Sequence, residues 1–461
     1  MKETSANMII EYLNYHKKYY ETYNTNMFVL MEVGSFYEAY TLEPINAGTN
    51  KGADLNKLSD MTDMHKSFKQ DIMYSGVEYR LLMCGFPTHS QDKFISMLLD
   101  NGMTLIMVDQ VGENPNGSKL RKVTKVLSPG TAIDIVKEND PTGNNLVCLV
   151  FNKGKDPSTK KPIFLAGISV IDFVTGNSYC TQIESTPDDN KLWLDECFRI
   201  IHSYSPKEVI LAKSRNCDAE VLFTEDYLIK EFECDNKPVH YIEKIADKYY
   251  KPAIIEDLLT KVFPNHTCYS ACDYLDLSYS EEARTSFVFL LQFAYEHDLN
   301  IIEKIKKPIN ENSSNTSIIS NNAIYQLDLV SQSNGNCLMK LLNKCSTLMG
   351  KRKYQYRLLH PITDFDTLNT RYGAIDKLKD QGIYKKIKKD LTNIRDIEKI
   401  HRRIGLIRCH PEEMSDLMLS YSFLEEVMDY TRNAISEDFC YLSKDLILRF
   451  KEYRATLESL F

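Results

Sequence analysis

The hydrophobic pattern of this chain changes once along its length, and that change limits the folds it can adopt. Up to about residue 279, short apolar runs bounded by turn residues alternate with helical patterns, which predicts α/β units. From about Ser280 onward, apolar residues recur only at helical spacing. A chain of 461 residues has room for about three domains. We therefore expect a multidomain protein divided into residues 1–139, 140–279 and 280–461.

The first segment, residues 1–139, predicts a small α/β domain. Its expected strands are the apolar runs at residues 27–31, 81–84 and 104–108. Gly34 ends the first run, and we expect a helix to begin near Ser35. Ser90 is expected to cap a further helix, which Gly102 stops.

The rest of the chain predicts a second α/β domain followed by helices alone. After a turn-rich linker at 140–144, the expected elements are strands at 146–151, 163–173 and 208–211 and a helix at 192–203. This strand–helix–strand order predicts a partly parallel sheet. Later helices are expected at residues 337–342, 349–359, 366–380, 384–404 and 411–433. The pattern at 443–461 is still helical at the last residue, from which we expect a missing remainder.

Charge and cysteine content restrict the classes of partner and site. The net charge is −8, so any DNA binding has to come from local basic stripes on an acidic body. The 12 cysteines are scattered, which is typical of a soluble protein in a reducing intracellular compartment. His266, Cys268 and Cys272 lack a second paired cluster, so no metal site is predicted. The sequence has no apolar signal core and no run suited to a membrane span.

The segment Met31-Glu32-Val33-Gly34-Ser35-Phe36-Tyr37-Glu38-Ala39-Tyr40 carries the most informative pattern. An exposed Phe beside an acid is unusual, because burying Phe gains about 1.5–3 kcal/mol. The pair makes sense if Phe36 wedges into a base step while Glu38 meets a base edge. Unstacking is easier where pairing is already defective, so such a site tests how readily a duplex deforms. Taken alone, the decamer is explained more simply by a core Phe36 and a Glu38 in a helix first turn.

Four segments together resemble the MutS family of mismatch-repair proteins. Gly34-Ser35-Phe36-Tyr37-Glu38 resembles its Gly-x-Phe-Tyr-Glu signature, and Cys84-Gly85-Phe86-Pro87-Thr88-His89 is similar to its Ala-Gly-(Val or Phe)-Pro-x-His segment. Val108-Asp109-Gln110-Val111 and the stretch 121–131 are similar to two further family segments, in family order and at family-like spacing. Looser resemblance covers residues 167–176, 290–295, 335–362 and 391–408.

The resemblance implies a role for each part of the chain. Residues 1–139 would be the mismatch-recognition domain, 140–279 a ribonuclease H-like connector domain, and 280–461 an incomplete all-α core and lever region. In this family the signature Phe stacks on the mismatched base and the Glu hydrogen-bonds it, which implies these roles for Phe36 and Glu38.

Two residues depart from the family pattern before the signature Phe. Glu32 and Ser35 stand where the family often has Arg and Asp. The change from Arg to an acid puts a local phosphate contact in doubt, and the change to Ser puts the orientation of the tip in doubt.

Two clusters of basic residues contain no acid. Lys119, Arg121, Lys122 and Lys125 lie close together, and we expect some of them to contact the DNA backbone near the wedge; a solvated strand face is the alternative. The second cluster comprises Lys340, Lys344, Lys351, Arg352, Lys353 and Arg357 on predicted helices, where a solvated face is the usual explanation.

The chain has no phosphate-binding loop. Gly350-Lys351 has Cys345 where the leading Gly should be and Arg352 where Ser or Thr should be. The resemblance implies that the ATPase domain, with its ATP and Mg²⁺, and the parts that form a homodimer lie beyond the helical core. We therefore expect no catalytic site, cofactor or ATP hydrolysis in this polypeptide. Its expected partners are double-stranded DNA with mismatches or small loops, bound weakly, and downstream repair proteins.

Two other functions are compatible with the sequence. Asp172-x-x-Thr175-Gly176 looks like the first strand of ribonuclease H-like folds, so a metal-dependent nuclease would use Asp172 with Glu184 and Glu196. The competing interpretation is that Asp172 orders a turn before Thr175 and Gly176. The third possibility is a non-catalytic scaffold that docks partners without a DNA role.

Overall fold

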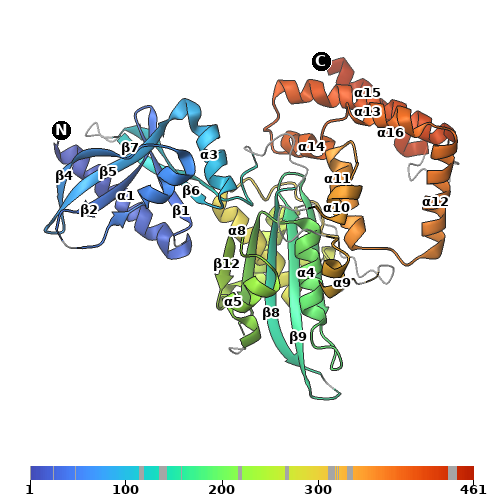
Figure 1. Ribbon diagram of the computed structural model, residues 1–461, viewed down its shortest axis with the longest axis horizontal. Helices are drawn as coiled ribbons and strands as arrows, with labels where there is room; N and C mark the ends of the chain where they lie inside the picture. Colours follow the sequence, from blue (N-terminus) through green and yellow to red (C-terminus); the bar gives the residue numbers. More distant parts are fainter. Residues whose placement is uncertain are drawn as a thin grey trace.

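The computed structural model has three parts in chain order, which Figure 1 shows in blue, in green to yellow, and in orange to red. The described residues are 2–460 except 24, 47, 114–118, 134–142, 157, 216, 218–220, 265–268, 310–316, 318, 320, 330–335 and 435–443. The predicted linker at 140–144 lies mostly outside them, as do His266 and Cys268. Two β-sheets and a group of helices account for the three parts.

The first sheet has the strand order β4-β5-β2-β1-β6-β7, with β3 paired to β2. Its strands are β1 (Met27–Val33), β2 (Phe36–Pro44), β3 (Lys51–Gly52), β4 (Ser67–Tyr74), β5 (Val77–Pro87), β6 (Thr104–Glu113) and β7 (Lys119–Leu127). Strands β1 and β6 are parallel, and the other pairs are antiparallel. The strands predicted at 27–31, 81–84 and 104–108 are confirmed within β1, β5 and β6.

Helices cover both faces of this first sheet. Helix α1 (Lys2–Tyr23) packs Ile9, Tyr12 and Leu13 onto one face. Helices α2 (Leu55–Thr62) and α3 (Gln91–Asp100) cover the other face. Because β1 is buried on both faces, its sequence is almost continuously apolar. Strand β2 is also buried along most of its length, although it contains Glu38, Thr41 and Glu43.

The predicted helix after Ser35 is wrong, because the chain makes a β-hairpin there. Gly34 adopts a φ of +64°, a left-handed conformation that Gly enters without steric cost, and β2 begins directly at Phe36. The hairpin pairs Val33 with Phe36, and β2 pairs along its other edge with β5. Neighbouring strands on both sides satisfy the backbone of residues 36–44, which outweighs any local preference for helix.

The second sheet has the strand order β10-β9-β8-β11-β12. Its strands are β8 (Asn145–Lys155), β9 (Pro162–Asp172), β10 (Asn177–Glu184), β11 (Glu208–Lys213) and β12 (Val239–Ile242). Strand β11 is parallel to both β8 and β12, while β9 is antiparallel to β8 and β10, which confirms a partly parallel sheet. The predicted helix at 192–203 is confirmed as α4 (Leu192–Tyr204).

Both faces of the second sheet are covered by helices. Helix α4 buries Trp193 against one face, where α5 (Glu225–Glu231) and the 3₁₀ turn η2 (Val221–Phe223) also lie. On the opposite face lie η3 (Asp247–Tyr250), α6 (Pro252–Val262), α7 (Ala271–Tyr274) and α8 (Glu281–His297). Helix α8 therefore builds the core of this α/β unit, although its sequence belongs to the predicted all-helical segment.

The remaining described residues are helical apart from their connections (Figure 1). The helices are α9 (Asn321–Gln326), α10 (Leu338–Leu342), α11 (Leu348–Leu359), α12 (Phe365–Asp380), α13 (Tyr384–Leu391), α14 (Ile397–Gly405), α15 (Pro411–Ala434) and α16 (Lys444–Leu460). The single helix predicted at 384–404 is wrong: it is interrupted between α13 and α14, where the Asp396 side chain caps α14 through the Lys399 N–H. No helix in the described parts of the chain has the length and apolar character of a membrane span.

Polar contacts fix the first α/β unit on the second. The Tyr23 hydroxyl at the end of α1 lies 3.2 Å from Nε2 of His297 on α8. After β7, the Ser128 hydroxyl and the Gly130 N–H both donate to Oε2 of the buried Glu208, at 2.6 and 2.9 Å. Buried polar groups that satisfy each other in this way orient the two units.

A buried carboxyl on α8 predicts a pH-dependent stability. Burial raises the pKa of Glu282 from 4.5 to about 7, with Asn152 as its main hydrogen-bond donor. A raised carboxyl pKa stabilises the fold below the unfolded value, and that contribution is lost as pH rises toward 7. We expect Glu282→Gln to be more stable than wild type at pH 8 by about 2 kcal/mol.

Urea unfolding at several pH values measures the stability difference for Glu282→Gln. The gap between variant and wild type should close as the pH falls toward 5, because both side chains are then neutral in the folded protein. A gap that stays constant across this pH range would contradict a titrating Glu282.

Candidate nucleic-acid interface

Phe36 lies at the tip of the β1–β2 hairpin, at one end of the first sheet. Its backbone pairs with Val33 on β1 and with Pro87 on β5, and the Thr88 N–H donates to the Ser35 carbonyl at 2.9 Å. The hairpin backbone is thus anchored on both sides. The Phe36 side chain is nevertheless 43% exposed, which is unusual for so large an apolar group. A rigid backbone therefore presents an accessible aromatic ring.

Glu38 follows on the same face of β2 but is buried. Alternation along the strand places Phe36 and Glu38 on one face, and Glu38 is only 6% exposed. Its Oε2 accepts from the Tyr40 hydroxyl and lies 2.5 Å from the Lys69 ammonium. The carboxylate is thus next to the exposed ring and is already paired within the protein.

Glu32, one of the two departures from the family pattern, has an internal role. Its Oε2 accepts from the Gln110 backbone N–H at 2.7 Å. Its carbonyl accepts from Gln110 Nε2 at 3.0 Å and from Arg121 Nε at 3.1 Å. Glu32 therefore ties β1 to β6 and β7 behind the hairpin tip.

The predicted basic residues of β7 point to different faces of the sheet. Arg121 pairs with Gln110 and is on the Phe36 face, half-buried beside the hairpin. Lys122 pairs with Asp109 and Lys125 with Met107, which places both on the opposite face. Lys119, at the start of the strand, forms an ion pair with Glu113. The structure thus brings Arg121, and not Lys122 or Lys125, to the face that carries Phe36.

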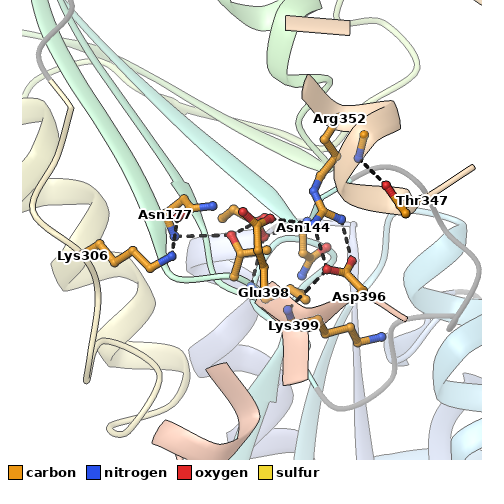
Figure 2. Close-up of polar contacts among 12 residues, drawn as sticks. Asn144, Asn177, Lys306, Thr347, Arg352, Asp396, Glu398 and Lys399 are labelled. Atoms are coloured by element: carbon orange, nitrogen blue, oxygen red, sulfur yellow. Dashed lines mark hydrogen bonds and ion pairs between the residues drawn. The ribbon is translucent and has the colours of Figure 1, made fainter. Parts of the chain in front are cut away.

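The second basic cluster contains a structural arginine. Figure 2 shows the Arg352 guanidinium on α11 directed at Asp396, which caps α14, and at Glu398 in the first turn of α14. Arg352 donates to both Asp396 oxygens, at 2.6 and 2.9 Å, and to Glu398 at 2.8 Å. A bidentate, partly buried contact of this kind holds two helices together. Three of the contacts that Arg352 makes are thus internal, to Asp396 and Glu398, although its side chain also lines a cavity beside α11.

Asp172 orders a turn, as one of the two sequence interpretations proposed. Its Oδ1 accepts from the N–H groups of Asn144 and Val174, and its Oδ2 accepts from the Thr175 hydroxyl. Glu184 is at the far end of the β9–β10 hairpin, and Glu196 pairs with Arg199 on α4. The carboxylates of the nuclease hypothesis do not converge, and no metal-binding cluster occurs among the described residues.

Lys69, Tyr40 and Gly85 complete the surroundings of Glu38, and sequence reasoning assigned none of them a role. Lys69 is 31 residues from Glu38, so no local spacing could connect the two. Tyr40 lies in the segment 31–40 and Gly85 in the segment 84–89, but their contacts with Glu38 depend on the pairing of β2 with β5.

Comparison with known proteins places this arrangement in a family. The family model for MutS domain I matches residues 13–136, and the model for MutS domain III matches residues 322–458. The chain belongs to the MutS family. The matched domain I includes the Phe36 hairpin, Lys69 and Arg121, and the matched domain III begins at α9. The segment between the two matches carries the five-stranded sheet.

Relatives of MutS type align along most of the chain. A mutS homolog of Acanthamoeba polyphaga mimivirus is 25% identical over 88% of this chain and 38% of its own length. A mitochondrial DNA mismatch repair mutS homolog of Sarcophyton glaucum is 25% identical over 92% of the chain and 46% of its own length. The DNA mismatch repair protein MutS of Petrotoga mobilis is 23% identical over 97% of the chain and 48% of its own length. The chain thus spans less than half the length of these relatives.

Proposed function

We propose that this chain recognises mismatched or otherwise distorted double-stranded DNA in mismatch repair. Phe36 enters a weakened base step from the minor groove, and Glu38 meets the edge of the displaced base. The observation that carries the proposal is the exposed ring of Phe36 at the tip of a doubly anchored hairpin, with the Glu38 carboxylate behind it on the same face. The curated relatives named as DNA mismatch repair proteins support the assignment.

The proposed selectivity comes from two opposing effects. Inserting a ring requires unstacking, which costs a few kcal/mol and least at a base that is already poorly paired. A carboxylate near the duplex repels phosphates, and a base edge that can hydrogen-bond it offsets this repulsion. For an intact duplex, the full cost of unstacking and the full phosphate repulsion both oppose binding. A mismatch reduces both, so recognition depends on deformability and not on a base sequence.

The proposal assigns ATP and Mg²⁺ to parts of a longer protein or complex. Gly350 and Lys351 lie in the first turn of α11, where the Thr347 hydroxyl already accepts from the Gly350 N–H at 3.0 Å. This helix start is capped from within and does not fit a nucleotide phosphate. Homodimer formation and contacts with downstream repair proteins are likewise proposed for regions beyond these residues.

The direct test compares the full chain on two duplexes that differ in one base pair. Competition binding, followed by fluorescence anisotropy at several salt concentrations, gives the ratio of mismatch to fully paired affinity. We expect a ratio above one with low absolute affinity. Equal affinity for the two duplexes at every salt concentration would contradict the proposal.

Arg121→Ala should weaken binding to both duplexes to the same extent. Arg121 is on the Phe36 face next to the hairpin, where a guanidinium can reach a phosphate but not a base edge that Phe36 already occupies. Losing one phosphate contact should lower the slope of log affinity against log salt by about one. Lys93→Ala on α3, beneath the opposite face, is the matched control and should change neither quantity. Loss of the mismatch preference itself would contradict this role for Arg121.

A further inference from the structure

Lys69 reaches Glu38 across an intervening strand. The sheet order places β5 between β4, which carries Lys69, and β2, which carries Glu38. The register of β4 against β5 shifts between Phe68 and Gln70, so Lys69 is the extra residue of a β-bulge. A bulge re-aims the side chain of its extra residue. This geometry directs the lysine over β5 and toward the hairpin.

Gly85 leaves space for the Glu38 side chain on the neighbouring strand. Gly85 pairs with Glu38, and a Cβ added at Gly85 would lie 2.4 Å from the Tyr37 carbonyl oxygen and 3.1 Å from Glu38 Cγ. Any other residue would therefore push against Glu38 and its backbone. Gly85 thus lets Glu38 hold the position in which it pairs with Lys69.

The contacts separate the orientation of Glu38 from the neutralisation of its charge. The Tyr40 hydroxyl donates to Glu38 Oε2 and fixes the carboxylate without adding charge. The Lys69 ammonium lies 2.5 Å from the same oxygen, 3.3 Å from the Tyr40 hydroxyl and 5.0 Å from the centre of the Tyr40 ring. The Lys69 side chain is 34% exposed and that of Glu38 is 8% exposed, so DNA can approach the lysine first.

We propose that Lys69 is a specificity-determining residue that tunes how strongly Glu38 rejects a fully paired duplex; this rests on the function proposed above. With Lys69 in place, the carboxylate carries a partner cation, and its repulsion of phosphates is weakened. Without Lys69, the carboxylate keeps its orientation through Tyr40 but loses its cation. A paired duplex then meets the full repulsion, whereas a mismatched base still offsets it with a hydrogen bond.

The test measures the full chain with Lys69→Met against a fully paired and a mismatched duplex. Lys66→Met is the matched control, because it removes the same charge from a lysine three residues before Lys69. The Lys66 side chain bonds Asn56 and does not contact Glu38. We expect Lys69→Met to weaken binding to the paired duplex more than to the mismatched one. The ratio of mismatch to paired affinity should rise about two- to fivefold, the size that one partly exposed ion pair supports. Lys69→Arg should restore the wild-type ratio.

A second background isolates the contribution of Glu38. In Glu38→Gln, the substitution Lys69→Met should lower affinity for the paired duplex no more than Lys66→Met does. If Lys69→Met in the chain that retains Glu38 lowered the affinity for both duplexes equally, Lys69 would be a simple phosphate contact. That result would overturn the proposal. A fall in the ratio would overturn it as well, because Lys69 would then be needed to present Glu38.

The same measurements distinguish failure of the proposed function from failure of this inference. If wild type binds both duplexes equally, mismatch recognition fails, and the specificity role of Lys69 fails with it. The comparison of Lys69→Met with Lys66→Met on the paired duplex then still reports whether Lys69 neutralises Glu38. If wild type prefers the mismatch but Lys69→Met leaves the ratio unchanged, only the inference about Lys69 is wrong.

Discussion

The full chain carrying Phe36→Ala should bind a mismatched duplex no better than a fully paired one. Phe36 is the exposed aromatic at the hairpin tip, and base–aromatic stacking is worth about 1–3 kcal/mol on alanine substitution. Affinity for the paired duplex should change little, because that affinity comes mainly from phosphate contacts. Competition binding on duplexes that differ in one base pair measures the loss. Thermal unfolding should be nearly unchanged, since the ring is not part of the core.

Phe68→Ala is the matched control for the wedge. Phe68 is another exposed phenylalanine in the same domain, 56% accessible, and the centre of its ring lies 5.9 Å from the guanidinium carbon of Arg80. It pairs with Leu82 on β5, whose side chain is on the sheet face opposite to Phe36. Phe68→Ala should therefore keep the mismatch preference. If Phe68→Ala abolished the preference and Phe36→Ala kept it, the wedge would be assigned to the wrong face of the sheet.

The second large effect is expected at Arg402, which joins α14 to the second α/β unit. The Arg402 guanidinium donates to the carbonyls of Phe173 and Glu303 and, at 2.7 Å, to that of Ile301. Arg402 is 4% exposed, and burial lowers its pKa to about 10, so it remains charged at neutral pH. Removing the side chain leaves three carbonyls without their donor. We expect Arg402→Ala to destabilise the protein by about 3 kcal/mol.

Tryptophan fluorescence during urea unfolding measures the effect of Arg402→Ala. The chain has one tryptophan, Trp193, which belongs to α4 and is buried against the second sheet, so the signal reports the unit that Arg402 contacts. Arg395→Ala is the control, because this arginine is exposed and pairs with Asp416 at 3.4 Å. It should lower stability by less than about 1 kcal/mol. Equal shifts for the two variants would contradict a structural role for Arg402.

Local sequence patterns predicted six of the twelve described strands, namely β1, β5, β6, β8, β9 and β11, and predicted a helix where β2 lies. Runs such as residues 104–108 and 208–211 are apolar and bounded by turns, so their extended conformation is visible locally. Residues 36–44 were expected to start a helix, yet they form a central strand held by β1 and β5. A strand buried on both faces loses the alternating pattern that identifies strands, and its partners are visible only in the folded sheet.

The candidate site was predictable only in part. Phe36 and Glu38 could be named because their motif resembles a family signature, and the structure puts both on one face of β2. The basic residues of β7 were grouped by sequence, but the register of β7 against β6 separates Arg121 from Lys122 and Lys125. A strand period of two residues sends neighbours to opposite faces, so a cluster in sequence is not a cluster in space.

The sequence alone determined the order of the units, the positions of six strands and of several helices such as α4 and α12, and the aromatic–acid pair of the first domain. These features are local, because a strand run, a turn or a signature is encoded within a few consecutive residues. The tertiary structure decided what those residues contact. Lys69 meets Glu38 across 31 residues, and Arg402 meets the Phe173 carbonyl across 229. Such contacts depend on sheet register, a bulge and helix docking, which arise when distant segments pack together and which no local pattern contains.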